Sequence, residues 1–81
     1  MSRNIQKSKD KRFTIATGFD SVCAFDANGE NGYFLQIYDK EAISDNNDEG
    51  VIVNVGFCPG LSRIEVEKAL KSSIKKYGIV L

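Results

Sequence analysis

The sequence predicts an α+β fold, with a small, mostly antiparallel sheet of three to five strands and a single C-terminal helix packed on one face. Two observations lead to this prediction. Segments before residue 60 alternate between apolar and polar residues, or are dense in β-branched residues, as strands are. Residues 62–77 instead repeat apolar residues at three- and four-residue spacing, as an amphipathic helix does.

The chain of 81 residues has the size of one small domain. We expect residues 13–81 to form a single α+β domain. Residues 1–12 are charged and hold only Ile5 as an aliphatic residue after the initiator methionine, so they are expected to form a flexible basic arm. The core of such a small domain is limited, and burial against a partner would add to its stability.

Three segments carry strand patterns. Residues 12–18 alternate, residues 33–40 give the strongest pattern, and residues 51–57 are rich in valine and isoleucine. The Asn-Gly pairs at 28–29 and 31–32 suit a tight hairpin turn. Residues 33–40 are therefore expected to pair antiparallel with the segment that precedes the turn.

Three other segments are less regular. Residues 19–26 fit either a short strand or part of a long loop. Residues 39–50 are acidic and rich in turn formers, which predicts an exposed loop. Residues 79–81 are apolar and could return to the sheet as a short edge strand, parallel or antiparallel to its neighbour.

The helix has signals at both ends. Ser62 and Glu65 have the spacing of a capping box, in which each side chain accepts from the backbone of the other residue. Leu61 and Val66 are placed for a hydrophobic staple, and Gly78 can close the helix in a left-handed conformation. The apolar stripe of the helix consists of Val66, Ala69, Leu70, Ser73, Ile74 and Tyr77.

The strongest strand pattern has apolar residues on both faces. One helix covers one face of a sheet, so either loops fold over the second face or that face meets another molecule. We favour the second interpretation, including self-association as a homodimer. The sequence therefore predicts a non-catalytic protein-interaction or regulatory module. Its candidate interface residues are Tyr33, Phe34, Gln36 and Tyr38.

The net charge of zero conceals a segregation of charge along the chain. Residues 1–12 carry five bases and one acid, residues 13–60 one base and eight acids, and residues 61–81 five bases and two acids. The basic ends suggest an alternative function in nucleic-acid binding. The candidate contacts are Arg3, Lys7, Lys9, Lys11, Arg12, Lys68, Lys71 and Lys75.

The acidic middle of the chain suggests a further alternative. A compact acidic surface around Asp45, Asp48 and Glu49 can occupy the basic groove of a target protein, as an inhibitor does. This hypothesis rests on charge distribution alone.

The composition argues against an enzyme and against a metal or cofactor site. The chain has no histidine, which is the commonest general base and a usual zinc ligand. Cys58 is the one plausible nucleophile, but a buried structural role is the preferred interpretation for it. Cys23 and Cys58 are expected to be free thiols, and a bridge between them requires that their strands be neighbours. The acidic loop at 45–56 lacks the final glutamate of a calcium-binding loop, and the turn at 56–60 lacks the lysine of a phosphate-binding loop.

No apolar run approaches the roughly 20 residues that cross a bilayer, so no membrane partner is expected. The N-terminal segment also lacks the apolar region of a secretory signal. The default expectation from these two observations is a soluble cytoplasmic protein.

Overall fold

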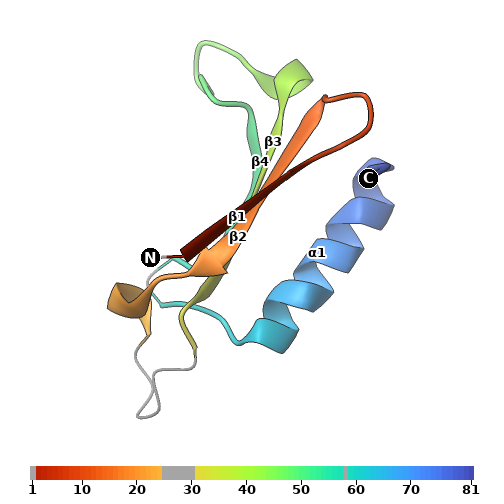
Figure 1. Cartoon of the computed structure of the whole chain (residues 1–81). Helices are drawn as coiled ribbons and strands as arrows, with labels where there is room; N and C mark the ends of the chain where they lie inside the picture. Colours follow the sequence, from red (N-terminus) through yellow and green to blue (C-terminus); the bar gives the residue numbers. More distant parts are fainter. Residues whose placement is uncertain (1, 25–30, 58) are drawn as a thin grey trace.

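The computed structural model describes residues 2–24, 31–57 and 59–81. These residues form one antiparallel sheet in the order β1-β2-β3-β4, with a helix packed against it (Figure 1). The predicted α+β fold is therefore confirmed. In chain order the elements are β1 (Ser2–Lys7), β2 (Phe13–Phe19), the 3-10 helix η1 (Ser21–Cys23), β3 (Tyr33–Asp39), the 3-10 helix η2 (Lys40–Ala42), β4 (Val51–Val55) and α1 (Arg63–Tyr77).

The segment expected to be a flexible arm is instead an edge strand and a turn. β1 pairs antiparallel with β2, from Ser2 opposite Phe19 to Lys7 opposite Thr14. In the turn that follows, Asp10 Oδ1 accepts from Ser8 Oγ at 2.7 Å and from the Arg12 amide at 3.0 Å. The arm prediction failed because it relied on side-chain polarity. An edge strand pairs through its backbone and tolerates polar side chains on both faces.

Of the two alternatives for residues 19–26, residues 20–24 fit the loop: residues 21–23 form η1, and Asp20 caps it by accepting from the Val22 amide at 3.0 Å. One smaller expectation needs correction. The chain end after α1 is not a strand, although Ile79 is buried and Val80 accepts from the Lys9 amide at 2.8 Å. The hairpin turn expected at residues 28–29 lies outside the described residues.

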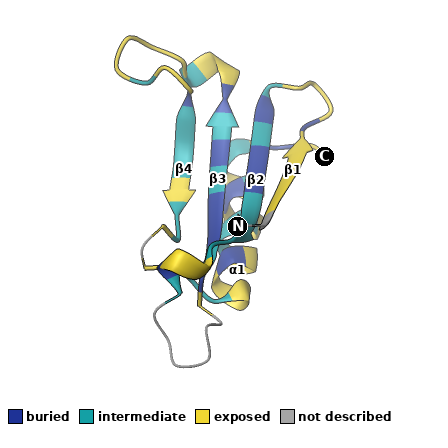
Figure 2. Cartoon of the chain, turned by 60° about the vertical axis from the view of Figure 1, so that its left-hand side comes forward, coloured by how far each residue is buried: buried dark blue, intermediate teal, exposed yellow. Residues whose placement is uncertain are grey.

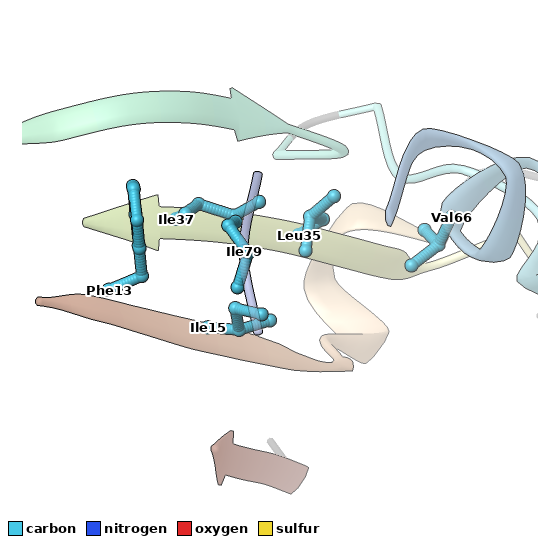
Figure 3. Packing of buried hydrophobic residues seen from close by; sticks show 6 residues of the cluster. All are labelled: Phe13, Ile15, Leu35, Ile37, Val66 and Ile79. Atoms are coloured by element: carbon cyan, nitrogen blue, oxygen red, sulfur yellow. The ribbon is translucent and has the colours of Figure 1, made fainter. Parts of the chain in front are cut away.

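α1 lies across one face of the sheet and closes the core. The core consists of buried residues that alternate along β2 and β3, together with Val66 of α1 and Ile79 after it (Figure 3). Ile15 lies opposite Ile37 across the two central strands. The six clustered residues are Phe13, Ile15, Leu35, Ile37, Val66 and Ile79.

The helix ends follow the sequence signals. Ser62 Oγ accepts from the Glu65 amide at 3.2 Å, and Glu65 Oε1 accepts from the Ser62 amide at 3.1 Å. These hydrogen bonds hold the pKa of the Glu65 carboxyl below its usual value. Gly78 closes the helix with a φ of 63°. The predicted capping box and C-terminal glycine are both confirmed.

The segment between β4 and α1 fixes where the helix begins. After β4 the chain returns to β3, where Tyr33 and Leu61 exchange backbone hydrogen bonds of 3.0 and 2.9 Å. Gly56 makes this path possible with a φ of 87°, and a Cβ at that position would clash with the carbonyl oxygen of Tyr33. The close backbone contact directs the helix onto the core face of the sheet.

Candidate protein-interaction site

The face of the sheet away from α1 is the candidate site, and we call it the open face. Successive residues of a strand point to opposite faces, so the register with the core residues identifies its members. Figure 2 shows this face in front of α1. It consists of Arg3, Ile5 and Lys7 of β1, Thr14, Ala16 and Gly18 of β2, Phe34, Gln36 and Tyr38 of β3, and Val51 and Asn54 of β4.

One end of the open face is closed by the chain itself. Phe34 is 0 % exposed, and its ring lies 4.6 Å from the ring of Phe57, measured between centroids. The loop around η1 reaches the same end of the sheet, since the Gly60 amide donates to the Cys23 carbonyl at 2.8 Å. Loops therefore cover the Phe34 end of this face, as one of the two sequence-based alternatives has it, and leave the rest uncovered. That the uncovered part meets another molecule stays a prediction.

A hydrogen-bonded row of side chains crosses the uncovered part, and we call it the polar belt. Its centre is Gln36, whose Oε1 accepts from Arg3 Nη2 at 3.1 Å and from the Tyr38 hydroxyl at 2.8 Å. Gln36 Nε2 donates to Asn54 Oδ1 at 3.5 Å. The belt thus ties β1, β3 and β4 together on the open face.

The small residues of β2 let the belt pass over that strand. Arg3 lies opposite Gly18, and Gln36 lies opposite Ala16, so the Arg3–Gln36 hydrogen bond spans a strand with minimal side chains at these positions. Ala16 is fully buried on a face that the helix does not cover. The belt is therefore held in place by its own hydrogen bonds, with the guanidinium of Arg3 and the ring of Tyr38 presented at the surface.

The four interface residues predicted from sequence do not lie together. Gln36 and Tyr38 belong to the polar belt. Phe34 lies in the closed end, and Tyr33 lies on the other face, where it packs against the core and has the Phe19 ring 5.0 Å away. Sequence reasoning missed Arg3, because its place on this face depends on the pairing of β1 with β2.

Asn54 was also missed as a site residue. Its alternation with Val53 and Val55 was visible in the sequence and placed it on the face opposite them. What the pattern could not show was that Asn54 lies opposite Gln36 on β3.

The basic residues proposed for nucleic-acid binding are spread over several surfaces. Arg12 is held by two carboxylates, and Arg3 belongs to the polar belt. The lysines are exposed, but they lie on different sides of the molecule. Lys7 is on the open face, Lys9 and Lys11 are in the β1–β2 turn, and Lys68, Lys71 and Lys75 are on α1.

Arg12 forms an ionic cluster with Asp39 at the end of β3. Its Nε and Nη2 donate to the two carboxylate oxygens of Asp39 at 2.8 and 2.9 Å, and Glu41 Oε2 lies 2.8 Å from the same Nε. The hydrogen bond from Arg12 holds the pKa of the Asp39 carboxyl below its usual value, and the same bond raises the pKa of Arg12. This cluster joins the β1–β2 turn to β3.

Cys23 is disulfide-bonded, so the expectation of a free thiol at this position is wrong. It lies in η1 and is 2 % exposed. Its carbonyl contacts Gly60, two residues after Cys58, the other cysteine of the chain. Cys58 itself, the candidate nucleophile, lies outside the described residues. The spacing of the cysteines in the sequence did not indicate that η1 and Gly60 lie close together, because this contact depends on how the two loops meet in the folded chain.

Within residues 2–24, 31–57 and 59–81, no group of three or more candidate ligands could hold a metal ion. In the same residues, no helix is long and apolar enough to cross a membrane. Comparison with protein-family models, with curated proteins and with solved structures found no match to this chain. Function is therefore inferred from the open face itself.

Proposed function

We propose that this protein is a non-catalytic protein-interaction module that binds another protein through the open face, with the polar belt at the centre of the interface. The observation that carries this proposal is the hydrogen-bonded row from Arg3 through Gln36 to Tyr38 and Asn54. Arginine and tyrosine are enriched where proteins bind one another, and side chains already fixed in position lose little entropy on binding.

The surroundings of the belt support the same function. Ile5 lies beside the belt on β1 and is 51 % exposed, which supplies an apolar contact next to the polar groups. Interfaces commonly combine such apolar contacts with a polar rim. Amide and guanidinium groups bind by hydrogen bonds and do not act as ordinary general bases, so recognition suits this set of side chains better than catalysis.

The charge of the open face favours an acidic partner. Arg3 and Lys7 are the charged members of the face as defined above, and both are exposed. Two copies meeting through this face would bring these basic side chains toward one another, whereas acidic groups of a different protein would complement them. We therefore favour a different protein over a homodimer as the partner.

Capture of a partner on immobilised protein tests this proposal. We expect the wild type and Lys68→Ala, which alters an exposed side chain on α1, to retain the same partner from the native cell extract. Gln36→Ala and Tyr38→Ala should lose it. Equal retention by all four proteins would contradict the proposal.

The alternative functions give different results in the same assay. Salt-sensitive retention on nucleic acid that survives Gln36→Ala but falls on removal of Lys9 and Lys11 would favour the nucleic-acid binder. Loss of the partner only on charge reversal of Asp45, Asp48 and Glu49 would favour the acidic inhibitor.

A further inference from the structure

Among the described residues, no strand pairs with the backbone hydrogen-bonding groups on the outer edge of β1. The Ser8 amide donates to the Phe13 carbonyl at 3.0 Å, in line with the register of β1 and β2. In an antiparallel pair the residues alternate between facing the partner strand and facing away from it. Ser8 faces β2, so Arg3, Ile5 and Lys7 direct their N–H and C=O groups outward. No strand lies beyond β1 in the part of the chain that the structure describes.

The same edge already accepts a chain at its far end. Lys9 follows Lys7 at the next outward-facing position, and its amide donates to the carbonyl of Val80 at 2.8 Å. Figure 1 shows the C-terminal end of the chain beside the β1–β2 turn. Backbone pairing along this edge is therefore possible in the folded protein. The pairing with Val80 ends at Lys9 and does not reach Arg3, Ile5 and Lys7, the three outward-facing residues of β1.

The opposite edge of the sheet is occupied by a side chain at its first residue, Val51. The side chain of Asn47 occupies the outer side of β4, where its Oδ1 accepts from the Val51 amide at 3.1 Å and its Nδ2 donates to the Val51 carbonyl at 3.0 Å. An amide side chain that pairs with the backbone in this way blocks strand addition at that residue. β1 has no such side-chain bond to its backbone among the described residues.

A groove runs beside β1 on the helix side of the sheet. It has a volume of about 430 Å³ and lies between the β1–β2 side of the sheet and α1. Its apolar lining includes Val66 and Leu70 of α1, and its polar lining includes Asn4 and Thr17 of the sheet. Arg63 and Glu67 of α1 also line it, and they pair with each other at 3.5 Å, so the groove carries no unbalanced charge from the helix. A strand added to β1 would place every second side chain on this side, next to the groove.

The charges beside the edge select the occupant. Pairing of β1 with β1 of a second copy, centred on Ile5, would put Arg3 opposite Lys7 on the same face at two symmetry-related positions. Like charges opposite one another destabilise a pair of strands. Acidic side chains at those positions would instead complement both basic residues.

We propose that the outer edge of β1 binds an extended segment of another protein by strand addition, with acidic residues opposite Arg3 and Lys7 and apolar residues toward the groove. This inference goes beyond the open face, because it depends on the backbone of β1 rather than on the side chains of Gln36 and Tyr38. Either proposal can fail while the other stands.

Fluorescence anisotropy with two labelled seven-residue peptides tests the inference on the full chain. One peptide alternates glutamate with valine, and the other alternates lysine with valine. We expect the glutamate peptide to bind at least tenfold more tightly than the lysine peptide, with an affinity that falls as salt rises. Equal affinity for the two peptides would overturn the charge assignment.

Two variants at one position separate edge pairing from side-chain contact. Ile5→Pro removes an outward N–H that β2 does not use, and Ile5→Ala keeps that N–H while removing most of the side chain. The glutamate peptide should bind Ile5→Ala within about threefold of the wild type and Ile5→Pro at least tenfold more weakly. Wild-type affinity for Ile5→Pro would overturn the proposal.

A second measurement covers the case in which Ile5→Pro does not fold. A glutamate peptide that is N-methylated at every residue has no backbone N–H to donate to a strand edge, so it should not bind the wild-type protein. Unchanged binding of the methylated peptide would contradict strand addition. Sedimentation that shows a wild-type dimer, lost in Ile5→Pro but kept in Ile5→Ala, would make a second copy the occupant and would also overturn the proposal.

Discussion

Arg3 of β1 donates a hydrogen bond of 3.1 Å to Gln36 of β3 across the strand that separates them. This is possible because β2 presents Ala16 and Gly18 beneath the bond. The same oxygen of Gln36 accepts from the Tyr38 hydroxyl at 2.8 Å. One amide side chain thereby fixes the orientation of the arginine and the tyrosine that the open face presents.

We predict that Gln36→Ala lowers the free energy of unfolding by about 1 kcal/mol, because it removes hydrogen bonds that are only half-buried. Urea denaturation measures this change. Gln6→Ala is the matched control, since Gln6 is an exposed β1 residue on the opposite face with no side-chain hydrogen bond among those found in the described residues. Equal effects of the two substitutions would show that the belt does not order the open face.

The Arg12–Asp39 pair predicts how stability depends on pH. The pKa of Asp39 is lowered in the folded state, chiefly by the hydrogen bond from Arg12. Its contribution to stability is therefore complete above the unfolded-state pKa of about 4 and is lost as the pH falls through the lower, folded-state value. Thermal unfolding between pH 7 and pH 2 measures this loss.

Asp39→Asn is the variant that isolates this contribution. It should lower the melting temperature at pH 7 by about 5 to 10 °C and should weaken the fall in stability below pH 4. Asp45→Asn, in the exposed loop before β4, should leave both quantities close to those of the wild type. A pH profile that Asp39→Asn leaves unchanged would contradict the assignment.

Two glycines with positive φ should differ in their tolerance of alanine. A Cβ at Gly56 would clash with the backbone of β3, whereas a Cβ at Gly78 would have no atom within 4 Å. Gly78→Ala is expected to cost about 1 kcal/mol, from its left-handed conformation alone. Gly56→Ala should cost at least twice as much, measured by urea denaturation. Similar costs at the two sites would mean that the chain after β4 does not approach Tyr33 as closely as described.

The disulfide at Cys23 predicts sensitivity to reducing agents. Reduction should lower the free energy of unfolding by about 2 to 4 kcal/mol, because it releases a constraint on the unfolded chain. Thermal unfolding with and without dithiothreitol measures the change, and Cys23→Ser should not respond to the reagent. A wild-type melting temperature that dithiothreitol leaves unchanged would rule out a stabilising disulfide.

Local signals in the sequence were sufficient for the helix and the strongest strand. The capping residues Ser62, Glu65 and Gly78 act within one or two turns of α1, so their spacing alone indicated both ends. The alternation of residues 33–38 likewise assigned Phe34, Gln36 and Tyr38 to one face, and the register confirms this. These features depend on neighbours that are close in the sequence.

Features that depend on distant contacts were not predictable in this way. β1 has no apolar pattern, and it is held in the sheet by backbone pairing, which side-chain polarity does not reveal. The segment was therefore mistaken for an arm. The closure over Phe34 and the bond at Cys23 depend on loops that meet only in the folded chain. The cytoplasmic location stays a prediction, and the disulfide argues against it because disulfides persist in oxidising compartments.

The affinity of the captured partner for matched variants tests the central claim most directly. We predict that Tyr38→Ala on the open face weakens binding at least tenfold, whereas Lys68→Ala on the opposite side of the molecule changes it by less than about twofold. Calorimetry at two salt concentrations should also show weaker binding at the higher one, since Arg3 and Lys7 meet acidic groups. Wild-type affinity for Tyr38→Ala, together with a loss for Lys68→Ala, would contradict the account.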